Sequence, residues 1–541
     1  MRPPVDHDAL PVTLRLRNTL TRSVEPVQPL AAPLPGQPPR IRMYTCGPTV
    51  YRYAHVGNLR SFLLADLIRR VLVYHGMEVV HVKNVTDVGH MRDERRDQGG
   101  DRLVIAAEVE GRTTAEIADF YEAAFHADEA AVNILPAHRF PRATEHIPQM
   151  VDMTERLVDA GFAYATPEGT VYYDVAAFPG YGRLSGNTLD QLREGHRVEV
   201  EADKRDHADF ALWKHAEEGR LLKWPTARWG DGFPGWHLEC SAMSMTYLGE
   251  QFELHTGGVD NVFPHHEDEI AQSAALTGLV PAVHWVHGEH LLMKGRKMAK
   301  SAGNFQRVTE LADEGIDPLA FRYLVLTSRY RHKLDYSDDS IRAAASALDS
   351  LRARLRALGP PPVGGDWAAP PALEARPAGD RPDGESKHAA GHGSDGAQPF
   401  RLADRAHAPA VPLSAEGRAL HDRFAAALDD DLDMPVALAA ARETLRAEVT
   451  DDEKRWLVLD ADLVLGLDLH RAWDASPGSA AQGASIASSE PPRGADTLLR
   501  ERAAARAAKD FARADALRAE LLELGVEPID RADGRLEWRL R

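Results

Sequence analysis

The stretch IRMYTCGPTVYRYAHVGNLRSFLLADLIRRVLVYHGMEVVHVKNV (residues 41–85) determines the fold class. It opens with a short apolar run, IRMYTC, which predicts a strand. After a Gly-Pro turn, LRSFLLADLIRRVLVYHG carries apolar residues at helical spacing and stops at Gly76. The run EVVHVKNV then predicts a buried strand. Strand, helix and strand in this order predict a βαβ unit and therefore an α/β fold with a parallel sheet.

The rest of the chain divides by composition around this unit. Strands return at QFELHTGG and AVHWVHGEHLLM, with a helix in HHEDEIAQSAALTG between them. The intervening text is mostly charged and helical in pattern, which indicates an insertion. Two Pro- or Gly-rich stretches predict linkers, and the tail predicts a helix hairpin, or a helix with a short hairpin. The expected boundaries are an α/β domain at 1–340 with an insertion at about 92–228, a helical connection at 341–357, a flexible linker at 358–412, a helical domain at 413–473, a linker at 474–494 and a C-terminal module at 495–541.

Composition limits the classes of protein that this chain can belong to. Its 541 residues are too many for one core, so several domains are expected. We expect no membrane span, because no run of about 18 apolar residues occurs. Two cysteines cannot form a disulfide framework, and the N-terminus lacks an apolar signal core, so a reducing cytoplasm is expected. The net charge of -18 neither supports nor excludes a nucleic-acid partner, since only a local basic groove meets phosphates.

Both cysteines stand near residue types that bind zinc. Cys46 follows the first predicted strand, and Cys240 lies in GWHLECSAMS. Further on, FPHHEDEI offers His265 and Glu269, which share a helix face because they are four residues apart. Two thiolates, an imidazole and a carboxylate suit zinc, with ligands that converge from distant segments as in a catalytic site. The alternative is that each cysteine is a small buried hydrophobe and that the acidic run is a solvated helix start.

Two further segments suit phosphate. HVGN (55–58) precedes a helix N-terminus, where free N–H groups favour anions, where His55 adds a donor and where Gly57 permits close approach. It matches neither common Gly-rich nucleotide loop. KGRKMAKSAGN (294–304) clusters four cations, including Lys297 and Lys300, which suits transient binding of a polyphosphate. Considered separately, HVGN is equally compatible with an ordinary turn, and KGRKMAKSAGN with a solvated basic loop.

Together these segments resemble the class I aminoacyl-tRNA synthetases, and among them the cysteinyl-tRNA synthetase family. CGPTVYRYAHVGN is similar to the family's stretch that runs into the HIGH motif, and KMAKS is similar to its KMSKS motif. Further similar segments follow in the family's order: NVTDV, KRDHADFALWK, GWHLECSAMS, HTGGVDNVFPHHEDEIAQ, YRHKLDYSDDS, ALDDDLDMP and KDFARADALRAEL. The resemblance covers nearly the whole chain apart from the two linkers and part of the insertion. It implies a Rossmann-like catalytic domain, a helical bundle that contacts tRNA and a C-terminal module of the anticodon-binding type.

The resemblance also implies an activity and a set of site residues. The activity is ligation of L-cysteine to tRNA(Cys) through cysteinyl-adenylate, with ATP and Mg²⁺, by a monomer. One zinc ion would select the substrate thiolate over serine's hydroxyl, because zinc with thiolate partners prefers a soft sulfur ligand. The implied residues are Cys46, Cys240, His265 and Glu269 for zinc, His55, Asn58, Lys297 and Lys300 for catalysis, His55, Gly57 and Lys300 for ATP, and Trp236, Asp260 and Thr86 for the amino acid.

The chain departs from the family pattern at several positions. Asn58 stands where the HIGH motif has its last histidine, Ala299 replaces the serine of KMSKS, and Thr256 interrupts the glycine triplet. Two rivals are kept. One is a paralogue that transfers cysteine to an amine, such as an amino-sugar in mycothiol synthesis, for which a C-terminal anticodon-type tail is superfluous. The other is a zinc-stabilised, tRNA-binding regulator without catalysis, for which the lysines and His55 are superfluous.

Overall fold

The computed structural model gives two compact units, residues 1–474 and 475–541. Within them the structure describes residues 14–88, 91–93, 98–188, 204–293, 295–297, 306–361, 413–474, 495–507, 510–523, 526–530 and 536–540. Most of the two predicted linkers, 358–412 and 474–494, therefore lies outside the described residues. Among the described residues, no helix has both the length and the apolar character needed to cross a membrane.

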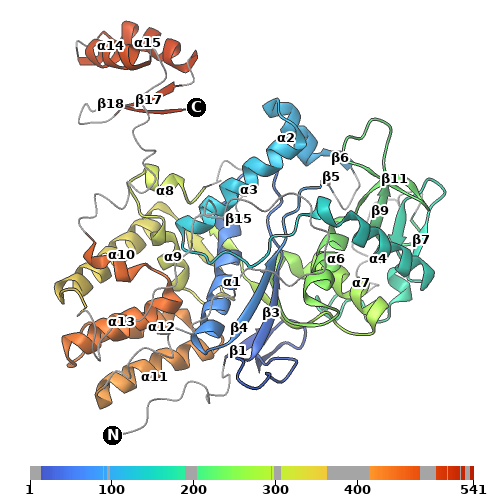
Figure 1. Cartoon of the computed structure of the whole chain (residues 1–541), viewed down its shortest axis with the longest axis horizontal. Coiled ribbons are helices and arrows are strands. Elements are labelled where there is room, and N and C mark those ends of the chain that lie inside the picture. The colour runs from blue at the N-terminus through green and yellow to red at the C-terminus, as the bar shows by residue number, and fades with distance from the viewer. Residues whose placement is uncertain are drawn as a thin grey trace. The chain divides into compact units, whose positions relative to one another are not determined.

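A four-stranded parallel sheet forms the centre of the first unit (Figure 1). Its strands are β3 (Arg40–Thr45), β4 (Glu78–Lys83), β12 (Phe252–Gly258) and β13 (Ala282–Gly288), in the order β13-β12-β3-β4. Thr45 at the end of β3 lies opposite both Lys83 and Thr256. The predicted parallel sheet is thus confirmed, and its register brings the carboxyl ends of three strands to one edge.

Helices cover both faces of the sheet (Figure 1). Helix α1 (Val56–Tyr74) packs against β12, β4 and β13, and α6 (Trp236–Leu248) packs against β3 and α7 (Glu267–Thr277). Because neighbouring strand residues point to opposite faces, Met43 joins the apolar core on the α1 side and Tyr44 joins the core that contains α6 and α7. Burial on both faces is the reason that these strands read as nearly continuous apolar runs.

The insertion differs in part from its predicted helical character. It begins with a short antiparallel pair, β5 (Met91–Asp93) and β6 (Gln98–Asp101). Three helices follow as expected, α2 (Arg102–Glu110), α3 (Thr114–Ala131) and α4 (Ile147–Asp159). A five-stranded antiparallel sheet follows, in the order β10-β11-β9-β8-β7. Its strands are β7 (Ala163–Ala165), β8 (Val171–Tyr173), β9 (Phe210–His215), β10 (Trp224–Thr226) and β11 (Gly230–Pro234). Sequence periodicity misses this sheet because three of its strands, β7, β8 and β10, have only three residues each, too few to establish an alternation, and because the pairing is non-local.

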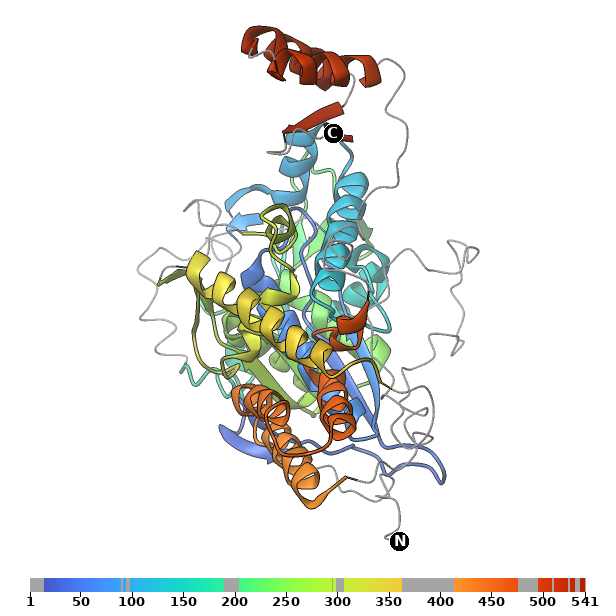
Figure 2. The same cartoon turned by 90° about the vertical axis from the view of Figure 1, so that its left-hand side faces the viewer.

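The helical region does not form a separate compact unit. Its helices lie beside α1 on one side of the sheet (Figures 1 and 2) and share one apolar core with it. They are α9 (Leu319–Leu326), α10 (Asp338–Ala357), α11 (Ala415–Asp429), α12 (Met434–Thr444) and α13 (Asp451–Leu465). The remaining short elements are β1 (Arg15–Asn18), β2 (Ser23–Pro26), β14 (Leu291–Met293), β15 (Arg296–Lys297), α8 (Glu310–Asp313) and β16 (Leu334–Tyr336).

A buried charge cluster fastens α1 to these helices. The Asp66 carboxylate accepts from Arg70 at 2.8 Å and from Arg322 of α9 at 2.7 Å, and all three side chains are fully buried or nearly so. The two guanidinium groups also donate to carbonyls near the end of α13, Arg70 to Leu463 and Arg322 to Leu465. Although burial by itself would raise the pKa of Asp66, the two arginines hold it below its ordinary value. The cluster therefore stays ionised within the core.

The second unit pairs helices with a hairpin. Helices α14 (Ala495–Ala507) and α15 (Phe511–Glu523) pack together around the buried Leu499 and Leu521. Strands β17 (Val526–Asp530) and β18 (Leu536–Leu540) form an antiparallel pair. The tail thus contains both of the forms that its sequence left open, a helix pair and a short hairpin.

The Asp66→Ala variant tests the buried cluster. We expect a loss of about 3–5 kcal/mol in the free energy of unfolding, because the change leaves two guanidinium groups buried without their carboxylate. Urea unfolding followed by circular dichroism measures the loss. The matched control is Asp152→Ala, which removes an exposed carboxylate 3.7 Å from Arg156 and should change stability by less than about 0.5 kcal/mol. Equal effects of the two variants would contradict the role of the cluster.

A second test uses His126 of α3, which lies 3.7 Å from Glu122 and 3.4 Å from Glu129. Burial lowers the pKa of His126, but the two carboxylates outweigh it and the net shift is upward. The stabilisation is therefore complete below the ordinary pKa of about 6.5 and is lost as pH rises through the higher folded value. The His126→Gln change should lower the melting temperature more at pH 6 than at pH 9. An equal drop at both pH values would be inconsistent with a charged His126.

Candidate functional site

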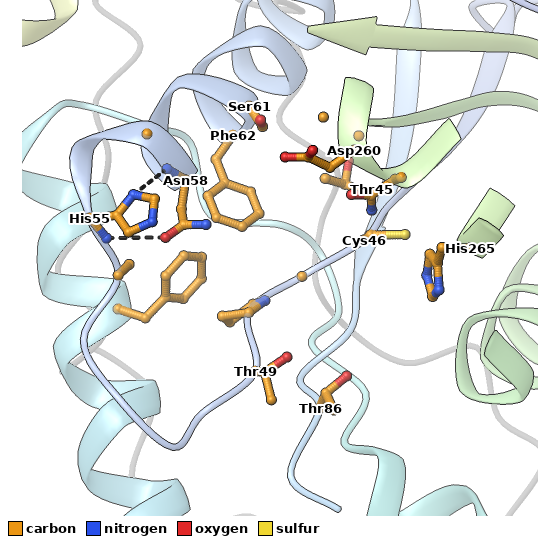
Figure 3. Close-up of a pocket in the computed structure, with 18 of the residues that line it drawn as sticks. Thr45, Cys46, Thr49, His55, Asn58, Ser61, Phe62, Thr86, Asp260 and His265 are labelled. Atoms are coloured by element: carbon orange, nitrogen blue, oxygen red, sulfur yellow. Dashed lines mark hydrogen bonds between the residues drawn. The ribbon is translucent and has the colours of Figure 1, made fainter. Parts of the chain in front are cut away.

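A cavity of about 400 Å³ opens at the carboxyl edge of the sheet (Figure 3). Its floor is the turn from Thr45 to Asn58, which joins β3 to α1. The other walls come from the ends of β4, β12 and β13, from α6 and from the insertion helices α2 and α3. Among the predicted site residues, the lining includes Cys46, His55, Gly57, Asn58, Thr86, Trp236, Cys240, Asp260 and His265.

Four of the predicted residues meet at one end of this cavity. Cys46 directly follows β3, Cys240 lies in α6, His265 lies in the helical turn η5 (Val262–His266) and Glu269 lies in the first turn of α7. Their ligand atoms all lie within 4.8 Å of one another. The two sulfurs are 3.8 Å apart, Cys46 Sγ is 3.7 Å from Glu269 Oε1, and that oxygen is 3.1 Å from His265 Nε2. The distant segments therefore converge as the residue types predicted.

The group fits a tetrahedral zinc ion. With Zn–S bonds of about 2.3 Å and Zn–O bonds of about 2.1 Å, two sulfur ligands lie about 3.8 Å apart and a sulfur and an oxygen about 3.6 Å apart. The distances between Cys46 and Cys240 and between Cys46 and Glu269, 3.8 Å and 3.7 Å, match these values. Two soft sulfur donors with one imidazole and one carboxylate are ligand types that zinc accepts.

Burial keeps both cysteines protonated in the absence of a cation. Burial raises the pKa of the Cys46 thiol well above its ordinary value, and the neighbouring Cys240 and Glu269 raise it further. Burial likewise raises the pKa of Cys240. Since protein groups alone favour the neutral thiols here, a bound divalent cation is what would make thiolates stable at neutral pH.

Histidines surround the four residues, and sequence reasoning did not single them out. His255 Nε2 lies 2.9 Å from Glu269 Oε2, and His237 Nδ1 lies 2.8 Å from His265 Nδ1, so each orients one member of the group. His266 Nε2 lies 3.2 Å from Cys46 Sγ and makes a second possible ligand group with Cys46, His255 and Glu269. Burial lowers the pKa of His266 well below its ordinary value, which keeps that ring neutral. One sequence feature could have indicated His255 as a site residue, namely its position in a predicted strand that ends at the same edge of the sheet as Cys46.

The HVGN turn forms a helix cap at another wall of the cavity. The Asn58 N–H donates to His55 Nδ1 at 3.1 Å, and the His55 N–H donates to Asn58 Oδ1 at 3.2 Å (Figure 3). A neutral imidazole that accepts at Nδ1 carries its proton on Nε2, so this cap leaves His55 Nε2 as a donor. Asn58 therefore has a definite structural role, although the family pattern has histidine there.

The N-terminus of α1 offers fewer free donors than its sequence predicts. The Val56 N–H already donates to the Gln306 carbonyl at 3.0 Å, and the Asn58 N–H is used by the cap. Among the described residues, no acceptor is found for the Gly57 N–H. A Cβ at Gly57 would lie 2.9 Å from the His55 ring, which explains the glycine. The donors that this helix end could offer to an anion are therefore the Gly57 N–H and the His55 ring.

The residues predicted to hold the amino acid surround the metal-ligand group. Trp236 begins α6, and its ring centroid lies 4.5 Å from that of His265. Asp260 is half-exposed and lies 3.5 Å from His290. The Thr86 hydroxyl is buried and donates to Glu239 at 2.8 Å, so this threonine is already engaged by a carboxylate that the sequence did not single out. The role of these three residues in substrate binding stays a prediction.

The remaining predicted positions lie along the lysine-rich segment and in β12. The backbone of Lys297 belongs to β15 and pairs with Leu292, whereas Lys300 and Ala299 lie outside the described residues. Thr256 is buried in β12, where its hydroxyl bonds to that of Thr45 at 2.8 Å. This departure from the glycine triplet therefore joins β3 to β12 directly behind Cys46.

Comparisons with known proteins agree with this arrangement. Residues 34–346 match the family model described as the tRNA synthetases class I (C) catalytic domain, and residues 488–539 match the Cysteinyl-tRNA ligase anticodon binding domain. A cysteine–tRNA ligase of Salinibacter ruber is 38% identical, with 98% of each chain covered. One from Thermus thermophilus is 37% identical, over 97% of this chain and 99% of the relative.

A solved structure extends the agreement to the fold. The methionyl-tRNA synthetase of Mycobacterium tuberculosis, bound by methionyl-adenylate, is 16% identical and matches with a TM-score of 0.51, over 82% of this chain and 97% of that one. At this identity the likeness concerns the fold alone, and it confirms the Rossmann-like class I architecture. With a catalytic-domain match over more than half of the chain and relatives that align over nearly all of it, the chain belongs to the cysteinyl-tRNA synthetase family of class I aminoacyl-tRNA synthetases.

Proposed function

We propose that the protein ligates L-cysteine to tRNA(Cys) at the expense of ATP. The observation that carries this proposal is a single cavity whose lining includes three of the four metal-ligand residues, Cys46, Cys240 and His265, and also His55, Gly57 and Asn58 of the HVGN turn. A site for a thiol and a site for phosphate are thereby held on the two ends of one turn. The names of the near full-length relatives support the same activity.

The sulfur-rich end of the cavity would bind the side chain of the amino acid. Cys46, Cys240, His265 and Glu269 would hold one zinc ion, which when bound supplies a soft Lewis acid that accepts a thiolate and discriminates against a hydroxyl. The Trp236 ring, whose centroid lies 4.5 Å from that of His265, would close this end against bulkier side chains. The half-exposed Asp260 carboxylate would hold the α-ammonium group.

The phosphate end would bind ATP, with Mg²⁺, for the first step. The cysteine carboxylate attacks the α-phosphorus and gives cysteinyl-adenylate and pyrophosphate. His55 Nε2–H and the Gly57 N–H would donate to phosphate oxygens, and Asn58 keeps the His55 proton on Nε2 by accepting and donating in the cap. Lys297 and Lys300 would offset the charge that develops on pyrophosphate.

In the second step, the terminal ribose hydroxyl of the tRNA attacks the adenylate and AMP leaves. No protein nucleophile is needed, because positioning and electrostatic stabilisation account for such chemistry. Cys46 would thus act as a metal ligand and not as a covalent catalyst. The C-terminal unit would bind the anticodon, and its match to an anticodon-binding family model disfavours an amino-sugar as the acceptor.

Metal content tests the ligand assignment. The Cys240→Ser variant should lose most of the bound zinc, and the KM for cysteine in pyrophosphate exchange should rise by at least about tenfold, because one of four ligands is exchanged for a poorer donor. Zinc is measured by mass spectrometry of the purified protein. The control is Ser241→Ala, the next residue of α6, which donates only to the His237 carbonyl. Unchanged zinc content in Cys240→Ser would refute the assignment.

Parallel acceptor assays test the reaction itself. The zinc-loaded protein should catalyse cysteine-dependent exchange of pyrophosphate into ATP and should charge tRNA(Cys), while an amino-sugar acceptor yields no product. Serine should give at least about 10³-fold lower exchange at equal concentration, since discrimination rests on sulfur. Ligation to the amino-sugar without charging would establish the paralogue. Absence of exchange would support a tRNA-binding regulator instead.

A further inference from the structure

Part of the cavity lining serves neither the metal-ligand group nor the phosphate cap. In the chain between Cys46 and His55, Tyr51 and Arg52 line the cavity, and so does Arg102 at the start of α2. The guanidinium carbon of Arg52 lies 5.1 Å from the Tyr51 ring centroid, and that of Arg102 lies 5.6 Å from it. Arg102 Nη1 also donates to the Tyr51 hydroxyl at 3.5 Å. Two cations are therefore held around one ring.

The same pattern continues onto the insertion. The Arg307 guanidinium lies 3.5 Å from the centroid of Tyr53, and that of Arg112 lies 4.7 Å from the centroid of Phe120. The rings of Tyr53 and Phe120 are themselves in edge contact, with centroids 5.9 Å apart. Phe120 is 38% exposed, which is unusual for a phenylalanine. A series of arginine–aromatic pairs thus extends from the cavity to the outer face of α3.

Charge indicates what this series is suited to bind. The chain carries a net charge of -18, yet four arginines gather here, of which Arg52 and Arg112 are exposed and the other two are partly buried. Arg307 lies 3.6 Å from Asp128 and Arg112 lies 3.8 Å from Glu110, so these two are paired with carboxylates. Within the part of the chain that the structure describes, no carboxylate lies within 4.0 Å of Arg52. An exposed guanidinium beside an aromatic ring favours a ligand with both an anionic backbone and flat rings.

Single-stranded nucleic acid has that composition. Its bases stack on aromatic side chains and on guanidinium planes, and its phosphates pair with arginine. Duplex nucleic acid keeps its bases inside and cannot use the rings. An acidic peptide would pair with the arginines but would leave the series of rings without a partner.

We propose that Tyr51, Arg52 and Arg102 bind the single-stranded 3′ end of the tRNA. This inference rests on the proposed function, since transfer from the adenylate requires the terminal ribose to enter the same cavity. The thiol end and the phosphate end of the cavity are assigned to cysteine and ATP, and the arginine–tyrosine group lines the same cavity. The pairs on Tyr53 and Phe120 lie where the preceding nucleotides would pass.

Separate assays of the two steps test the proposal. In Arg52→Gln, cysteine-dependent pyrophosphate exchange, which needs no tRNA, should stay within about twofold of the wild type. The kcat/KM for tRNA in charging should fall about tenfold, because one stacked or phosphate-bound guanidinium is removed. The dependence of log(kcat/KM) for tRNA on log salt concentration should become less steep by about one unit if Arg52 meets a phosphate.

A matched control separates the subsite from a general loss of charge. Arg139 is exposed, lies 5.4 Å from the Tyr247 ring centroid and is not part of the cavity lining. The Arg139→Gln variant should leave both steps unchanged. Arg102→Gln provides a second variant, with the same expected pattern as Arg52→Gln.

Three outcomes would overturn the proposal. The first is unchanged tRNA kinetics in both Arg52→Gln and Arg102→Gln. The second is an equal fall in exchange and charging, which would assign the arginines to ATP. The third is an equal loss of tRNA charging in the Arg139→Gln control. Failure of the proposed function is recognised separately, because the wild-type protein itself would then show no exchange. Exchange by the wild type, together with a defect in Arg52→Gln that is confined to tRNA charging, supports both the proposed function and the proposed tRNA site.

Discussion

The parallel pairing of β3 with β4 and β12 is the constraint on which the whole site depends. Because Thr45 lies opposite both Lys83 and Thr256, the three strands end together and release their following residues at one edge. The hydroxyl bond between Thr45 and Thr256 fixes this register across β3 and β12. A slip of one residue would turn Cys46 to the opposite face of the sheet, away from Cys240 and Glu269.

Buried charge is stabilised in two different ways in this unit. In the core, Asp66 is balanced by two arginines, so the protein alone provides the countercharge. At the sheet edge, Cys46, Cys240 and Glu269 gather potential anions beside histidines, and burial raises the pKa values of both thiols. Replacing one of these groups by an arginine would complete a salt bridge, but it would fill the space that a thiol substrate must enter. A small divalent cation would balance the charge, and a substrate thiolate would join the four protein ligands as a fifth.

Sequence reasoning was most successful where one local pattern determines the structure. The spacing of apolar residues in 41–85 predicted the βαβ unit, and the i, i+4 spacing of His265 and Glu269 predicted that these two side chains lie near one another. The structure confirms both predictions. It failed for the antiparallel sheet of the insertion, whose short strands pair residues as distant as Val171 and Trp213. It also separated the helical region from the sheet domain, because the shared core with α1 depends on contacts between residues far apart in sequence. The histidines around Glu269 were missed for the same reason.

The turn from Cys46 to Asn58 joins residues of three proposed binding sites, for the thiol, for the tRNA end and for phosphate, in one continuous segment of chain. Cys46 directly follows a strand and Asn58 caps a helix, so both ends of the turn are fixed by regular structure. Tyr51 lies between them, in contact with Arg102 of the insertion. If the thiol binds at one end and the phosphate at the other, the carbonyl that joins them must lie near the middle of the turn. The nucleophile that attacks this carbonyl has to approach there, and the proposed tRNA site at Tyr51 and Arg102 lines the same cavity.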